Sequence, residues 1–209
     1  MIACCLQTCD RYDLTLRTLE TFAQHNDLSK FRLLHADDAS TDQEQMLDLV
    51  KYYGFRTVFL SRERVGMRMV RWGLISAAVR RGADWIFLLE NDIETLRPFP
   101  WELFEHVQKH PEVSCLRLYG RFKDAARTDP CLTTHKRRNH EPVRWRPFRD
   151  APEAAQIGQI HWSAQPCVTN AQMLLRHHQT SEEPDGWTVR VKKNVVSHIG
   201  AERTPGRIM

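Results

Sequence analysis

The sequence has neither a long hydrophobic run nor a cysteine framework. No apolar stretch approaches the ~20 residues that a membrane-spanning helix requires, and the first ten residues carry no basic segment and no small-residue cleavage site. Six cysteines are few for 209 residues, and none of them is spaced as CxxC. These absences argue against a membrane span, a signal peptide, a disulfide scaffold and a zinc ribbon. We therefore expect a soluble, cytoplasmic protein with free thiols.

The sequence also lacks the glycine-rich loops of the common nucleotide-binding folds. A dinucleotide-binding domain has glycines directly after its first strand, and a P-loop needs the pattern GxxxxGK[ST]. Here the segment 7–11, Gln-Thr-Cys-Asp-Arg, follows the first expected strand without a glycine, and the P-loop pattern does not occur. Both folds are therefore disfavoured.

Strand and helix patterns alternate through the first half of the chain. Short apolar runs predict strands, and apolar residues at helical spacing predict helices between them. The expected strands cover 2–6, 31–35, 57–60 and 85–89. Of the expected helices, the first is capped by Asp13, the second begins at a Thr41–Glu44 capping box and ends at Gly54, and the third covers 67–81 and ends at Gly82. This alternation predicts an α/β fold with a mostly parallel central sheet and helices on both faces.

The regular alternation breaks in the second half. A short helix near 101–107 and a strand over 113–118 precede a long excursion over about 120–156, which contains four prolines. A strand at 167–169, a helix at 170–178 and an extended stretch over 187–199 complete the pattern. The length suits a single domain, with 1–118 as one half and 119–209 as the other.

The net charge of +4 is unevenly distributed. Residues 117–149 hold ten Lys and Arg against three acids, a local charge of +7, whereas the rest of the chain sums to −3. Such an excess is typical of a solvated loop, but together with Phe122, Trp145 and Phe148 it also suits a surface for a polyanion.

Acidic residues follow two of the expected strands. Ligands of open parallel sheets bind beyond the carboxyl ends of the strands, and these positions hold Asp37-Asp38 and Glu90-Asn91-Asp92. In an extended segment Glu90 and Asp92 point to the same side and can bind one hard cation. Helix capping beside a solvated carboxylate is the alternative for each pair. Because both pairs fall at one edge, a cation or hydrogen-bond donors are expected between them.

Four segments, in this order and spacing, resemble the N-terminal half of a GT-A fold glycosyltransferase of the family 2 type. They are 2–11, ADDASTD at 36–42, RERVGMRMVR at 62–71 and FLLENDIE at 87–94. The resemblance covers roughly residues 1–118. It implies a GT-A fold and the transfer of a sugar from a nucleotide-diphosphate sugar, most of all a UDP-sugar, to an acceptor hydroxyl.

The resemblance also implies roles for individual residues. It places Thr8, Arg11, Asp37 and Asp38 around the nucleoside, Gly66 and Arg71 near the diphosphate, and Glu90 and Asp92 at Mn²⁺ or Mg²⁺. The family's DxD motif is here Glu-Asn-Asp, so Asp92 is the firmer ligand and Glu90 is expected to act through water. VVSHIG at 195–200 is similar to a late segment that returns a histidine to the metal or diphosphate, which implies His198 as a third ligand; a packed or surface histidine is the alternative.

An inverting transferase needs a base for the acceptor hydroxyl. The segment 181–185, Ser-Glu-Glu-Pro-Asp, resembles the acidic pair found before the last helix of inverting members. We predict Glu183 as this base, with Glu182 and Asp185 as the next candidates. A polar turn marked by Pro184 explains the same segment equally well.

The basic excursion falls where the acceptor side of such an enzyme is expected. A hydroxylated base in DNA, as in phage DNA modification, is our leading acceptor, with Lys136, Arg137 and Arg138 as phosphate contacts and the host cytoplasm as the site of action. A glycan or a small molecule is the alternative, and no membrane-binding element is found. A nucleotidyltransferase would be expected to carry a glycine-rich loop after its first strand, and a non-catalytic nucleic-acid-binding module would gain nothing from acids at the sheet edge.

Overall fold

The computed structural model describes residues 1–118, 146–152, 155–159, 167–180, 187–191 and 193–199. The predicted base candidates (Glu182, Glu183 and Asp185) and phosphate contacts (Lys136, Arg137 and Arg138) lie outside these ranges. Within them no helix is long and apolar enough to cross a membrane.

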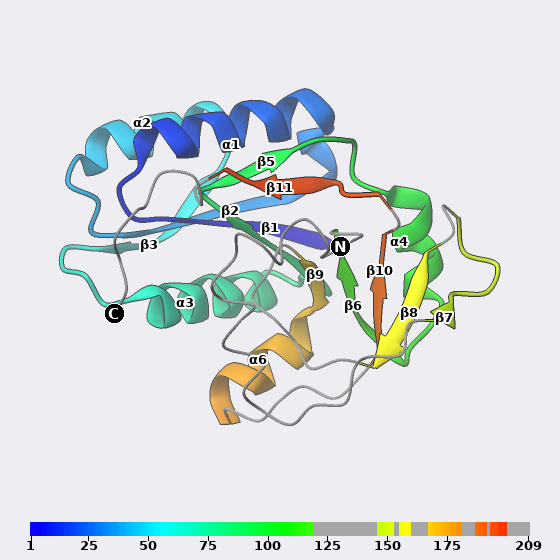
Figure 1. Cartoon of the computed structure of the whole chain (residues 1–209). Coiled ribbons are helices and arrows are strands. Elements are labelled where there is room, and N and C mark those ends of the chain that lie inside the picture. Colours follow the sequence, from blue (N-terminus) through cyan, green and yellow to red (C-terminus); the bar gives the residue numbers. More distant parts are fainter. Residues whose placement is uncertain (119–145, 153–154, 160–166, 181–186, 192, 200–209) are drawn as a thin grey trace, which may run out of the picture.

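A nine-stranded sheet organises the described chain, in the order β3-β2-β1-β4-β9-β6-β10-β8-β7 (Figure 1). The strands are β1 Ile2–Thr8, β2 Arg32–Asp38, β3 Arg56–Ser61, β4 Trp85–Glu90, β6 Val113–Arg117, β7 Arg146–Pro147, β8 Gln156–Gln159, β9 Cys167–Asn170 and β10 Trp187–Arg190. Only β9 and β8 run against the other seven strands of this sheet. A separate two-stranded sheet pairs β5 Ile93–Thr95 with β11 Val196–His198.

Helices cover both faces of the large sheet. They are α1 Tyr12–His25, α2 Gln43–Tyr52, α3 Met67–Arg80, α4 Trp101–Gln108 and α6 Ala171–Thr180, with a 3₁₀ turn η1 at Leu28–Lys30. Figure 1 shows α1 and α2 on one side of the sheet and α3 and α6 on the other. The predicted α/β architecture, with a mainly parallel sheet and helices on both faces, is confirmed.

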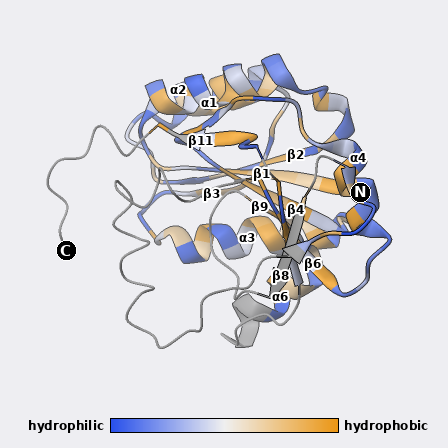
Figure 2. Ribbon diagram, turned by 45° about the vertical axis from the view of Figure 1, so that its right-hand side comes forward, coloured by the Kyte–Doolittle hydropathy of each residue, from blue (hydrophilic) through white to orange (hydrophobic). Residues whose placement is uncertain are grey.

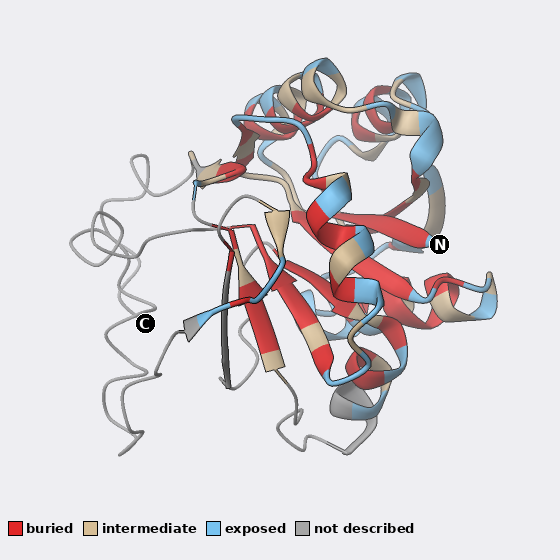
Figure 3. Cartoon of the chain, turned by 90° about the vertical axis from the view of Figure 1, so that its right-hand side faces the viewer, coloured by how far each residue is buried: buried red, intermediate tan, exposed pale blue. Residues whose placement is uncertain are grey.

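Strand β4 belongs to both hydrophobic cores. Trp85, Phe87 and Leu89 join the core that includes residues of α1, α2 and α4, whereas Ile86 and Leu88 join the core with α3 and α6. This explains its unbroken apolar run, since a strand buried on both faces has no polar side. The sheet is buried throughout much of its length (Figure 3), and the helices around it combine hydrophobic and hydrophilic positions (Figure 2). The packing of both cores against the sheet therefore positions the carboxyl ends of its strands.

The helix starts differ from the predicted caps. Helix α1 has Arg11 as its N-cap, in the left-handed conformation at φ 57°, and Asp13 lies in the first turn. Helix α2 is capped by Asp42, whose side chain accepts from the backbone N of Gln45 at 3.1 Å. The predicted Thr41 cap is wrong, because the side chain of Asp42 makes the capping bond; the Thr41 backbone N donates to Asp10 across the sheet edge. Gly54 and Gly82 follow α2 and α3 at positive φ, as predicted.

Candidate active site

The candidate site lies at the carboxyl ends of β1, β2, β3 and β4. These four strands are parallel neighbours, so their ends meet at one edge of the sheet. The loops that leave this edge contain residues 9–11, 39–42, 62–66 and 91–92. Each of the four segments that carried the sequence resemblance contributes one of these loops.

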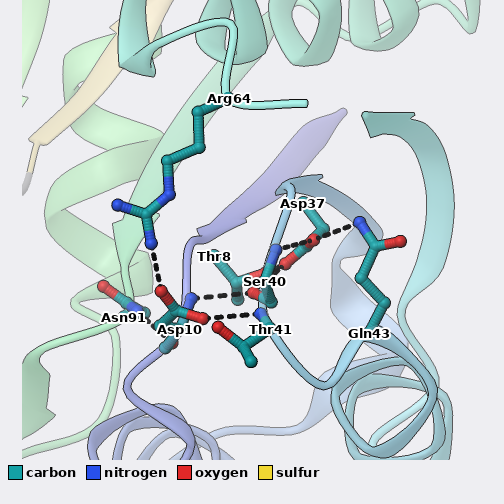
Figure 4. A network of polar contacts seen from close by, with 8 residues as sticks. All are labelled: Thr8, Asp10, Asp37, Ser40, Thr41, Gln43, Arg64 and Asn91. Atoms are coloured by element: carbon teal, nitrogen blue, oxygen red, sulfur yellow. Dashed lines mark hydrogen bonds and ion pairs between the residues drawn. The ribbon is translucent and has the colours of Figure 1, made fainter. Parts of the chain in front are cut away.

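A buried hydrogen-bond network surrounds Asp37 at the end of β2 (Figure 4). One carboxylate oxygen accepts from the backbone N of Ser40 at 2.8 Å and from Gln43 at 2.9 Å, and the other accepts from the hydroxyls of Thr8 at 2.6 Å and Ser40 at 2.5 Å. Burial opposes ionisation, but the hydrogen bonds from Ser40 and Thr8 lower the pKa of Asp37 overall. Asp37 and Thr8 therefore hold two strand ends together, and their contact with a nucleoside stays a prediction.

His35 extends this network into the sheet. Thr8 gives its proton to Asp37, so its oxygen accepts from His35 Nε2 at 2.8 Å, and Nδ1 of the neutral ring then accepts from the Thr57 hydroxyl at 2.9 Å. His35 is fully buried, and this burial lowers its pKa to about 4. The ring is therefore neutral at physiological pH and serves as a structural link between β1, β2 and β3.

Asp38 fixes the loop before α3. Its two carboxylate oxygens accept from the backbone N of Val65 at 2.8 Å and of Gly66 at 3.0 Å. Gly66 caps α3 with a φ of 88°, a conformation that favours glycine, although a Cβ there would meet no atom within 4 Å. The structure thus brings together two residues that the sequence predicted for one site.

Two arginine–carboxylate pairs lie at and after the end of β4. Arg71 of α3 pairs with Glu90 at 3.2 Å, and Arg11 pairs with Asp92 at 3.1 Å. Asn91 and Asp92 form a turn between β4 and β5, so the extended segment predicted across Glu90–Asp92 is wrong. The turn lies where the chain leaves the large sheet after β4 and enters the second sheet with β5, which pairs with β11.

No family model matches this sequence, and no curated protein does. Among solved structures, TarS residues 1–349 from S. aureus matches with a TM-score of 0.60 and 11% identity, over 96% of this chain and 61% of that one. Glucosyl-3-phosphoglycerate synthase from Mycobacterium tuberculosis, in complex with Mn²⁺, UDP and phosphoglyceric acid, matches with a TM-score of 0.58 and 12% identity, over 99% of this chain and 72% of that one. The chain has the GT-A fold. It spans about three fifths of the TarS 1–349 chain.

The carboxylates at this edge of the GT-A fold suit a hard divalent cation. Asp92 has a side chain that is 19% exposed, and its partner Arg11 is half-exposed on a long flexible stem, so this pair can open. Glu90 instead faces Arg71, which is 9% exposed, and a guanidinium that is this buried needs its counter-ion. The donor set therefore fits a metal held chiefly by Asp92, as carboxylate oxygens favour Mn²⁺ and Mg²⁺.

The late segment returns to the same turn. Strand β11 places His198 opposite Ile93 of β5, and the backbone N of Ile199 donates to the carbonyl of Asp92 at 2.9 Å. The described residues contain no group of three His, Cys, Asp or Glu placed to hold a metal. Strand β11 thus brings the backbone of His198 close to the turn that holds Asp92, and its role as a ligand stays a prediction.

The sequence did not single out Asp10, which lies at the centre of the edge. Its side chain accepts from the backbone N of Thr41 at 2.7 Å and pairs with Arg64, its backbone N donates to Ser40 at 2.7 Å, and its carbonyl accepts from Asn91 at 3.3 Å (Figure 4). A polar residue directly after the first strand was a signal for a role at this edge. Its partners, however, are 30 to 81 positions away in sequence.

Proposed function

We propose that this chain transfers a sugar from a nucleotide-diphosphate sugar, in the first instance a UDP-sugar, to an acceptor hydroxyl, with Mn²⁺ or Mg²⁺ as cofactor. The observation that carries the proposal is the meeting of Asp38, Gly66, Arg71 and Asp92 at one edge of a GT-A fold. Structures of similar fold hold the matching ligands: UDP with Mn²⁺ in the mycobacterial synthase and UDP-GlcNAc in TarS.

The charges at the edge suit a diphosphate. Arg11 and Arg71 come from opposite sides of the sheet edge, and each now neutralises a carboxylate. Asp92 would hold the metal directly, Glu90 would act through water, and His198 would be a third ligand. When bound, the metal would stabilise the charge of the departing diphosphate as a Lewis acid. Arg11, released from Asp92, would add positive charge at the phosphates.

Glu183 is the proposed base, with Glu182 and Asp185 as alternatives. A carboxylate that takes the proton of the acceptor hydroxyl raises its nucleophilicity as the bond to the sugar forms. We expect Glu183→Gln to keep donor affinity and to lower turnover by ~10² or more. The same loss in Glu182→Gln or Asp185→Asn alone would move the role to that residue, and normal turnover in all three would remove this segment from the mechanism.

DNA is the proposed acceptor, on the ground of the +7 charge of residues 117–149. Each Lys or Arg that neutralises a phosphate releases a condensed counter-ion, so affinity should fall with salt with a log–log slope of ~0.7 to 0.9 per contact. Replacement of Lys136, Arg137 and Arg138 by Ala should flatten that slope and leave donor binding unchanged. Negligible DNA binding at low salt would move the acceptor to a glycan or a small molecule.

A donor screen tests the activity itself. The chain is incubated with Mn²⁺ and a panel of UDP- and GDP-sugars, and products are followed by mass spectrometry. We expect release of the nucleoside diphosphate from one donor, through transfer or slow hydrolysis. Release of pyrophosphate in a parallel incubation with a nucleoside triphosphate and a sugar phosphate would instead indicate a nucleotidyltransferase, and no release in either incubation would contradict both enzymes.

A further inference from the structure

We propose that Asp10 and Arg64 form a clamp that positions the loop 62–66 for donor binding. The role in donor binding rests on the proposed function, whereas the clamp itself rests on the contacts alone. Asp10 is then a positioning residue, which acts through the loop that it holds.

Asp10 is the point at which all four loops of the edge meet. Its backbone N and its side chain bond Ser40 and Thr41 in the loop after β2, its carboxylate pairs with Arg64 in the loop after β3, and its carbonyl accepts from Asn91 in the turn after β4. Asp10 itself lies in the loop after β1. A change at this residue therefore reaches every part of the edge.

The backbone at Asp10 supports a positioning role. Asp10 and Arg11 have φ values of 56° and 57°, two consecutive non-glycine residues in the left-handed region. Such conformations cost ~1 to 3 kcal/mol each and persist where surrounding contacts enforce them. The bonds from Asp10 to Ser40, Thr41 and Asn91 supply that enforcement. These bonds also fix the backbone at Arg11, whose side chain pairs with Asp92.

The loop 62–66 is held at its start, middle and end. The Ser61 hydroxyl donates to the carbonyl of Glu63 at its start, Arg64 reaches Asp10 in its middle, and Asp38 binds the backbone N of Val65 and Gly66 at its end. All five residues of this loop are exposed, so packing does not fix them. The bond from Ser61 is local, so among the described residues the two acids are the restraints that reach this loop from the ends of β1 and β2.

The exposure of the Asp10–Arg64 pair separates its role from stability. The side chains of Asp10 and Arg64 are 34% and 58% exposed, and exposed ion pairs contribute only ~0 to 1 kcal/mol to folding. Hydrogen bonds from Thr41 lower the pKa of Asp10, so it is charged at neutral pH. Loss of the pair should thus release the loop while the fold stays intact.

Hydrogen exchange tests the clamp without a ligand. In Asp10→Asn and Arg64→Gln the amides of Val65 and Gly66 should exchange faster than in the wild type, with melting temperatures within about 2 °C of it. Arg62→Ala removes an exposed arginine two positions away in the same loop and serves as the matched control, with wild-type exchange expected. Wild-type exchange in both Asp10→Asn and Arg64→Gln would overturn the clamp.

Titration with UDP and Mn²⁺ tests what the clamp does. We expect about 10-fold weaker binding in each single variant and no further loss in the double variant, because both changes break one interaction. Arg62→Ala should bind as the wild type. Wild-type affinity in the single variants, or losses that add in the double, would overturn the positioning role. If the wild type itself does not bind UDP, the proposed function fails and this role with it, while the exchange result still decides the clamp.

Discussion

Asp37 and Asp92 lie at the same edge of one sheet, yet their surroundings differ. Asp37 is fully buried and accepts four hydrogen bonds of 2.5 to 2.9 Å from three neighbouring residues. Asp92 is partly exposed in a turn and pairs with a half-exposed arginine at 3.1 Å. Loss of the hydrogen bonds around Asp37 would cost several kcal/mol of folding stability, because buried polar groups would be left without partners. A partly exposed ion pair such as Arg11–Asp92 contributes only ~0 to 1 kcal/mol, so a ligand can readily replace Arg11. The first carboxylate thus maintains the edge, and the second is available for a ligand.

The largest expected effect on activity is a loss of metal binding and transfer in Asp92→Ala. Removal of the chief carboxylate should weaken Mn²⁺ binding in the presence of UDP by at least ~100-fold, or 2.7 kcal/mol, and abolish transfer. The free energy of unfolding should change by less than about 1 kcal/mol, because the pair with the half-exposed Arg11 is partly open to solvent. Electron paramagnetic resonance of free Mn²⁺ measures the first quantity and urea unfolding the second. Unchanged Mn²⁺ binding would falsify the assignment of Asp92.

The opposite result is expected for Asp37→Ala. This change leaves the buried hydroxyls of Thr8 and Ser40 without their acceptor and removes one of the two acceptors of the half-buried Gln43 amide. It should lower the free energy of unfolding by about 4 kcal/mol and the melting temperature by about 12 °C. Calorimetry measures both. A melting temperature within 2 °C of the wild type would mean that the network does not support the edge, and the contrast with Asp92 would disappear.

Acid should weaken the buried network through His35. Its folded pKa of about 4 lies below its ordinary value of 6.5, so the unfolded chain takes up the proton first. Stability is therefore complete above pH 6.5 and is lost as the pH falls toward 4, by about 2 kcal/mol between pH 8 and pH 5. Urea unfolding at several pH values measures this slope. In His35→Gln the loss of stability between pH 8 and pH 5 should be smaller by that amount. An equal loss in both proteins would show that His35 does not titrate as its burial implies.

The smallest effect is expected at the start of α2. Asp42→Ala removes one exposed capping bond to Gln45 and should cost about 1 kcal/mol without altering UDP or Mn²⁺ binding. Thermal unfolding measures the cost, and Thr41→Ala serves as the comparison, since its contact with Asp10 is made by the backbone and is kept. A larger loss in Thr41→Ala than in Asp42→Ala would restore Thr41 as the cap.

The sequence predicted most elements of this fold because their signals are local. The run 85–89 is apolar throughout, as a strand in two cores must be, and Gly54 and Gly82 mark helix ends by conformation alone. The cap of α2 was placed one residue early because Thr41 and Asp42 are both favoured capping residues, and only the structure shows that the side chain of Asp42 makes the bond. The motif resemblance placed Asp38, Gly66, Glu90 and Arg71 in one site. It did not predict that Asp38 bonds to Gly66 or that Glu90 pairs with Arg71. The central place of Asp10 depends on the strand order β3-β2-β1-β4, which periodicity does not specify.

Calorimetric titration of the wild-type chain with UDP, in the presence and absence of Mn²⁺, tests the central claim most directly. We predict binding that requires the metal, because Asp92 and the diphosphate share it, and no metal-dependent binding in Asp92→Ala. Equal UDP affinity with and without Mn²⁺, or no UDP binding under either condition, would contradict the assignment of this edge as a nucleotide-sugar and metal site.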